Sequence, residues 1–133
     1  MMATFHLKVL TVEGPLFDGD VDRCIVRTVS GDVGILPRHI RYVAALGIGS
    51  LIIVQDGKKR EAAIAGGFID VSDEGTVVFA RTCEWAEDID VNRARKRVEE
   101  GKARSAAEMS DKQIKVNEYK IKRALNRIRV AEK

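Results

Sequence analysis

The chain has 133 residues, 45% of them hydrophobic, and a formal net charge of +3, which fits one ordinary domain or one small domain with an appendage. No apolar run approaches the roughly 20 residues of a membrane-spanning helix, so direct membrane insertion is not expected. The two cysteines lie in apolar, strand-like contexts, and buried free thiols fit a reducing compartment better than a disulfide. The two histidines have no ligand spacing around them, so no metal is expected.

Residues 1–88 show short β-branched runs separated by turn signals. Phe5, Leu7 and Val9 alternate with polar residues, as in a half-buried strand. Asp56-Gly57 is a strong signal for a tight hairpin, and Gly66-Gly67 is expected to break or kink the strand that precedes Phe68. Strands at intervals of about ten residues predict a β-sandwich or barrel.

The character of the chain changes at Ile89. Ten of the eleven glycines and both prolines precede it, with 9 Lys and Arg against 13 Asp and Glu, whereas 14 Lys and Arg stand against 7 Asp and Glu in residues 90–133. We therefore expect two domains, an acidic β-rich body over 1–88 and a basic helical hairpin over 89–133.

Local signals predict where the two helices of this tail begin and end. Asp90 is a suitable N-cap for a helix from Val91 to about Ala107, and Ser110 with Gln113 forms a capping box for a second helix. The expected packing positions are Ala94, Val98, Gly101 and Ser105 in the first helix and Ile114, Ile121, Leu125 and Ile128 in the second.

The segment Gly31-Asp32-Val33-Gly34-Ile35-Leu36-Pro37-Arg38-His39 is the densest motif of the body. It is interpreted either as a hairpin turn followed by a proline-set edge, or as a fixed loop that presents Asp32, Arg38, His39 and Arg41 to a partner. No acid or nucleophile lies near His39 in sequence, which argues against catalysis there.

The tail carries a second candidate site, because Arg93 lies in the first turn of one helix and Arg123 and Arg127 lie one turn apart in the other. One interpretation is a helix cap with a solvated basic face. The other is a site where three guanidiniums hold phosphate oxygens, while Asp90 accepts a hydrogen bond from a hydroxyl or amine. No phosphate-binding glycine loop is present, and we expect no enzymatic activity from the chain by itself.

Five motifs in order make the chain resemble the epsilon subunit of the F-type ATP synthase. They are Phe5-His6-Leu7, Phe17-Asp18-Gly19-Asp20-Val21, the 31–39 segment, Gly66-Gly67-Phe68-Ile69-Asp70-Val71 and Arg123-Ala124-Leu125-Asn126-Arg127. The chain departs from the family pattern at Arg38, Arg41 and Gly47-Ile48-Gly49. The resemblance implies a mainly β sandwich of about ten strands, followed by an antiparallel two-helix hairpin.

The family further implies a rotor-stalk role, in which the body binds the gamma subunit and the c-subunit ring through a region that includes Asp32, Arg38 and His39. It implies ATP as a regulatory ligand, and an extended tail that contacts the alpha/beta headpiece and inhibits ATP hydrolysis. The implied location is peripheral, on the cytoplasmic face of the plasma membrane. The implied nucleotide-binding residues are Glu84, Ile89, Asp90, Arg93, Ala94, Arg123 and Arg127.

A different class of function, a small basic nucleic-acid-binding protein, is suggested by the basic tail. Only 5% of the residues are aromatic, and acidic residues interrupt the basic ones. A steep salt dependence of affinity for DNA or RNA would favour this alternative.

Overall fold

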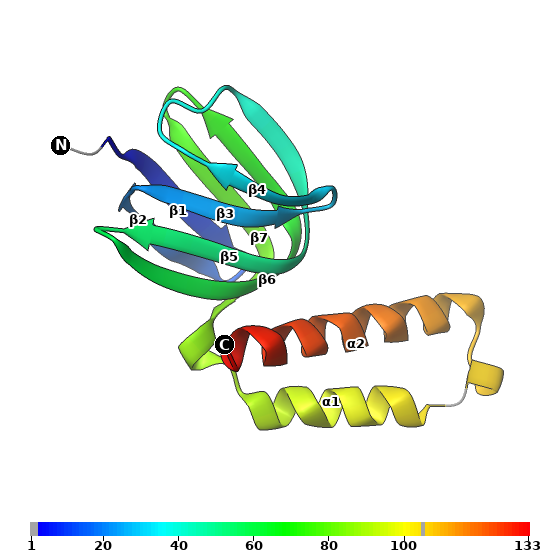
Figure 1. Ribbon diagram of the computed structural model, residues 1–133. Coiled ribbons are helices and arrows are strands. Elements are labelled where there is room, and N and C mark those ends of the chain that lie inside the picture. Colours follow the sequence, from blue (N-terminus) through cyan, green and yellow to red (C-terminus); the bar gives the residue numbers. More distant parts are fainter. Residues whose placement is uncertain (1–2, 105) are drawn as a thin grey trace. The chain divides into compact units, whose positions relative to one another are not determined.

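The computed structural model describes residues 3–104 and 106–133 (Figure 1). These residues divide into two compact units, one ending at Trp85 and the other beginning at Ala86. The sequence-based boundary, between residues 88 and 89, lies three residues further along the chain.

The first unit is a seven-stranded sheet in the order β2-β1-β7-β6-β5-β3-β4. Neighbouring strands are antiparallel except β1 and β7, which are parallel. The curled sheet forms two layers, with β3 and β5 in front of β1 and β7 in Figure 1. The strands are β1 (Phe5–Thr11), β2 (Gly14–Val21), β3 (Arg23–Thr28), β4 (Gly31–Ile35), β5 (Tyr42–Gln55), β6 (Lys58–Ser72) and β7 (Gly75–Trp85).

The expected count of about ten strands is corrected to seven. Two strands are long, β5 with 14 residues and β6 with 15, and Gly66-Gly67, which was expected to break or kink a strand, lies inside β6. The pairing of these two strands is interrupted between Ala45↔Phe68 and Ile48↔Ala65. Gly66 and Gly67 have φ angles of 75° and 109°, so the backbone bends there while the strand continues.

Inward-facing side chains of both layers form one core. Leu7, Val9, Val26, Leu51 and Ile53 are at most 1% exposed, which confirms the alternating pattern expected from the sequence. The burial of this apolar surface is the main force holding the sheet in its curled form. At the β5–β6 turn the positive φ angles of Asp56 (53°) and Gly57 (76°) match the expected tight hairpin.

The second unit consists of η1 (Ala86–Asp88), α1 (Val91–Ala103), η2 (Ala106–Glu108) and α2 (Asp111–Ala131). The Ser110 hydroxyl accepts from the Gln113 backbone and the Gln113 side chain accepts from the Ser110 backbone, as predicted. The predicted end of the first helix at Ala107 is wrong, because Arg104 takes an extended backbone. Residues 102–104 are exposed, so no packing face supports a longer helix.

The two helices contact each other through small residues. Ala94, Val98 and Gly101 are buried as expected; Ser105 lies outside the described residues. The buried Asn117 side chain donates from Nδ2 to the Gly101 carbonyl oxygen at 3.0 Å.

The packing face of α2 differs from the predicted one. Leu125 is 46% exposed and Ala124 is 2% exposed, so the predicted place of Leu125 in the interface is wrong. Ala124 therefore lies on the buried face of α2 and Leu125 on its exposed face. Neither helix of the described chain combines the length and apolar character of a membrane span.

Candidate functional site

Asp32 lies on β4, directly across from Arg27 on β3. Arg27 Nε donates to Asp32 Oδ1 at 2.6 Å, and a second guanidinium nitrogen reaches Oδ2 at 3.4 Å. Hydrogen bonding to this carboxylate raises the pKa of Arg27. The sequence pattern predicted Asp32 as a contact residue but did not predict its ion pair with Arg27.

Arg38 and His39 lie in the loop after β4. Arg38 has a φ of 63°, a left-handed conformation that is uncommon for residues other than glycine. His39 Nδ1 lies 2.8 Å from the Ile40 carbonyl oxygen, and its ring meets Tyr42 edge-on with centroids 5.9 Å apart. These contacts fix the histidine ring against its own loop.

Arg38 and His39 line a cavity of about 470 Å³, together with the start of β1 and the β6–β7 turn. His6 also lines this cavity, whereas Asp32 does not. The His6 ring lies 3.0 Å from a carboxylate oxygen of Asp20 and 2.5 Å from one of Asp18. Its pKa is raised above 6.5, first by the hydrogen bond to Asp20. The polar residues of the 31–39 segment therefore lie in two places, with Asp32 on the β3–β4 hairpin and Arg38 and His39 at the cavity. The sequence did not predict His6 as a cavity residue.

The outer face of β5, β6 and β7 carries an exposed apolar patch, here called the outer-face patch, formed by Val43, Phe68 and Phe79. Their exposed fractions are 65%, 45% and 38%, and the two phenylalanine rings stack with centroids 4.8 Å apart. Asp70 is paired with Val43 across the strands, and its Oδ1 is buried with no hydrogen-bond partner among the described residues. Alternation alone could not reveal this patch, because apolar residues occupy both faces of these strands.

The predicted nucleotide-binding residues at the start of α1 have different environments. Asp90 is the N-cap, and its Oδ1 accepts from the Arg93 backbone at 3.0 Å. The Arg93 side chain is exposed. Ile89 and Ala94 are 9% and 0% exposed, so in this conformation they pack within the protein.

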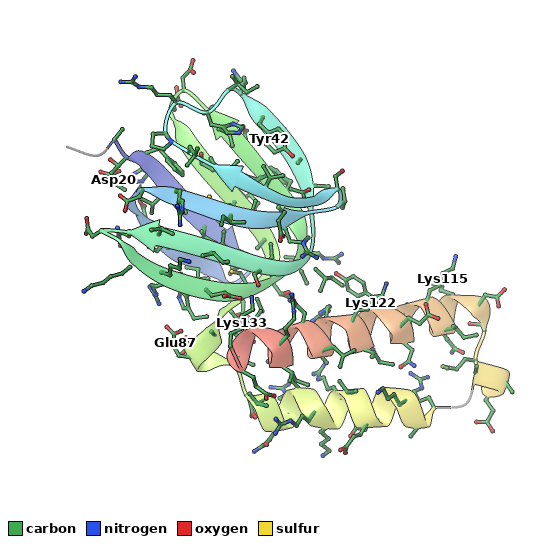
Figure 2. All side chains as sticks on the ribbon, in the orientation of Figure 1. Asp20, Tyr42, Glu87, Lys115, Lys122 and Lys133 are labelled. Atoms are coloured by element: carbon green, nitrogen blue, oxygen red, sulfur yellow. The ribbon has the colours of Figure 1, made fainter. Side chains whose placement is uncertain are left out.

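The later arginines lie on the last turns of α2. Arg123 lies over the Tyr119 ring at 5.7 Å, and Arg127 is partly buried. An ion pair of 2.8 Å between Arg95 and Glu132 brings the first turns of α1 and the end of α2 together. Figure 2 shows Glu87 and Lys133 at this end of the hairpin and Lys115 near the opposite end.

Glu84 lies on β7 in the first unit. Within residues 3–104 and 106–133, no group of three or more His, Cys, Asp or Glu side chains could hold a metal ion. Both cysteines are free, and burial raises the pKa of each thiol to about 12, which leaves them protonated and unreactive at neutral pH.

Comparison with known proteins gives consistent matches. A family model described as "ATP synthase, Delta/Epsilon chain, beta-sandwich domain" matches residues 4–86. An ATP synthase epsilon chain of Ruminococcus albus is 41% identical over 133 residues, covering 99% of each chain. One of Bacillus velezensis is 38% identical over 130 residues, covering 98% of each.

Two solved structures are also similar. A chain in the Euglena gracilis mitochondrial ATP synthase, solved as an OSCP/F1/c-ring assembly, has a TM-score of 0.81 at 26% identity, covering 93% of this chain and 79% of that one. A chain in the central stalk and c-ring of the Tetrahymena thermophila mitochondrial ATP synthase has a TM-score of 0.64 at 11% identity, covering 95% of each chain. The second likeness supports the fold alone.

Proposed function

The chain belongs to the epsilon chain family of ATP synthase, and from this premise we propose that it is a non-catalytic subunit of the rotor stalk of that complex. The β unit is the assembly module and binds the gamma subunit and the c-subunit ring. The hairpin is a regulator that senses ATP and, when extended, contacts the alpha/beta headpiece and inhibits ATP hydrolysis. The observation that carries the proposal is the 41% identity that continues through the helical tail as well as the sheet.

The outer-face patch supports a docking role for the β unit. Exposed stacked aromatic rings beside Val43 suit a surface that another protein covers. A partner with apolar side chains would bury the rings. We assign this partner to the gamma subunit.

The 31–39 segment supports contact with the c-subunit ring. Asp32 is held by Arg27 on the surface of a short hairpin, and Arg38 and His39 line the neighbouring cavity. A loop whose polar side chains are fixed by local contacts loses little conformational entropy on binding. The Euglena gracilis relative was itself solved in an assembly that includes a c-ring.

The folded hairpin supports nucleotide binding at the end where the start of α1 meets the end of α2. Arg95 and Glu132 join the two helix ends, and Arg93 and Arg127 lie within one to two turns of that ion pair in sequence. ATP bound across these arginines would favour the closed form, because a ligand shifts an equilibrium only by its differential affinity for the two forms. An extended tail would separate the two ends and lose the site.

Reconstitution of the synthase tests the division of roles. ATP synthase depleted of its epsilon subunit would receive either the full chain or a chain ending at Asp88. We expect both to rebind and to support ATP synthesis driven by the ion gradient, and only the full chain to restrain ATP hydrolysis. Failure of the shortened chain to bind would contradict the assignment of assembly to the β unit. Equal restraint by both would contradict a regulatory tail.

Calorimetry with ATP tests the nucleotide site on the isolated full chain. Each charge-assisted contact contributes about 1.5–3 kcal/mol, so Arg93→Ala and Arg127→Ala should each weaken binding about tenfold or more. Arg104→Ala removes an exposed arginine from the opposite end of α1 and serves as the matched control. Absence of binding at millimolar ATP, or equal binding by all variants, would contradict the nucleotide site and reduce the match at residues 89–94 to a helix cap.

A further inference from the structure

The pairing of Arg27 with Asp32 is a fork-like contact on the surface of the β3–β4 hairpin. The shorter contact is 2.6 Å and the longer one is 3.4 Å, and the two side chains are 35% and 53% exposed. A planar guanidinium that meets both oxygens of a carboxylate fixes the orientation as well as the position of that carboxylate. Asp32 is therefore both oriented and accessible to a partner.

Gly49 makes this arrangement possible. The register between β3 and β5 shifts between Val26 and Thr28, so Arg27 lies at an irregularity in the ladder. A Cβ atom on Gly49 would lie 2.5 Å from Arg27 Cβ and 2.6 Å from its Cγ, closer than atoms can approach. The aliphatic part of Arg27 thus lies over the bare backbone of β5, and a larger residue would displace it.

We propose that Arg27 is a positioning residue for Asp32, held in place by the absence of a side chain at Gly49, and that it determines which groups of the partner this surface accepts. The proposal rests on the proposed contact between Asp32 and the c-subunit ring. Arg27 orients the carboxylate before the partner arrives, so that less side-chain freedom is lost on binding.

The charge of the pair defines the chemistry of the partner. A lone carboxylate would favour a lysine or arginine of the partner, whereas the Arg27–Asp32 pair has no net charge and presents an oriented acceptor. The matching groups are neutral hydrogen-bond donors, such as side-chain amides, hydroxyls or backbone N–H groups. Binding at this point should accordingly depend little on ionic strength.

Rebinding of the full chain to epsilon-depleted ATP synthase, over a range of salt concentrations, tests the proposal. We expect Arg27→Ala to weaken binding about three- to tenfold, the range that follows from immobilising one side chain, and to make it more salt-dependent. Arg27→Lys keeps the charge but not the fork and should recover only part of the affinity. The same variants should bind the soluble headpiece with its gamma subunit, which lacks the c-ring, as the unaltered chain does.

Gly49→Ala provides an independent variant, because it displaces Arg27 without removing any charge. Its matched control is Gly19→Ala on β2, outside the 31–39 segment, where an added Cβ would meet only side-chain atoms of Gln55 and Phe17, at 3.3 Å or more. Melting temperatures of all variants establish that each one is folded. We expect Gly49→Ala to weaken binding like Arg27→Ala, and Gly19→Ala to leave it unchanged.

The outcomes distinguish the positioning role of Arg27 from the contact made by Asp32. If Asp32→Ala weakens binding but Arg27→Ala strengthens it or leaves it unchanged, then Arg27 competes with the partner or is irrelevant, and the positioning role is wrong. If Asp32→Ala has no effect on binding, the proposed c-ring contact itself is wrong. If Arg27→Ala weakens binding to the soluble headpiece as much as binding to the complete synthase, the proposal is also overturned.

Discussion

Replacing Gly101 by alanine should open the helical hairpin, although it improves the helix in which it lies. A Cβ at this position would approach Ile121 Cγ1 to 2.6 Å and Cδ1 to 2.9 Å, whereas ordinary contacts lie between 3.4 and 4 Å. Ile121 cannot move away easily, because a β-branched side chain has one strongly preferred rotamer in a helix. The helices must therefore separate, which also stretches the 3.0 Å bond from Asn117 to the Gly101 carbonyl.

Two effects of opposite sign decide the magnitude. Alanine is favoured over glycine in a helix by about 1 kcal/mol, while overpacking a tight interface costs about 1–3 kcal/mol. A lengthened buried hydrogen bond adds about 1 kcal/mol to the cost. We expect the free energy that keeps the hairpin closed to fall by about 1–3 kcal/mol.

Native-state hydrogen exchange of the full chain measures this change. Amide protection should fall in α1 and α2 and stay unchanged in the sheet, which serves as the internal control. In an Ile121→Ala background the clash is gone, so Gly101→Ala should there be neutral or stabilising. Increased protection of both helices in the single variant would show that helix propensity dominates, and would refute the close packing inferred at Gly101.

Three further changes have defined outcomes. Asp90→Ala should lower the protection of the first turn of α1 by about 1 kcal/mol, and Asp90→Ser should restore it; no change would mean that the hydrogen bond at 3.0 Å is not stabilising in solution. Cys24 and Cys83, with pKa values raised by burial to about 12, should resist alkylation near pH 8 until urea unfolds the chain. Rapid labelling of the folded chain would contradict the burial of these thiols. Because the folded-state pKa values exceed the ordinary thiol value of 9.0, the stability that these thiols contribute should be full below about pH 9 and fall as the pH rises towards 12. The pKa of His6 is raised by Asp20, so the His6 ring should titrate above 6.5 by NMR, and Asp20→Ala should move the titration back down.

Local features of the sequence were sufficient where a short segment determines its own structure. The Asp56-Gly57 turn, the capping box at Ser110 and the N-cap at Asp90 depend on neighbouring residues alone. Alternation likewise identified Leu7 and Val9 as core residues. In each case the determining contacts lie within a few positions of one another.

Features that depend on tertiary register could not be predicted in this way. Arg27 meets Asp32 only because β3 and β4 pair in one register, and it has room only because Gly49 lies on a third strand. Ala124 is buried and the adjacent Leu125 is exposed, and periodicity alone does not distinguish between the two neighbouring positions. Gly66-Gly67 predicted either a break or a kink, and only the pairing of β5 with β6 on both sides of it shows that the strand bends and continues.

The parallel pairing of β1 with β7 bears on how the sheet resists mechanical force. The chain enters the sheet at the start of β1 and leaves it at the end of β7, and the pairs Leu7↔Thr76 to Thr11↔Ala80 connect the two strands. A pull between these two points acts along the strands, across hydrogen bonds that run from one strand to the other. Such a load shears the whole ladder at once and cannot open it one bond at a time. A pull on the tail is therefore borne jointly by all the bonds of this strand pair.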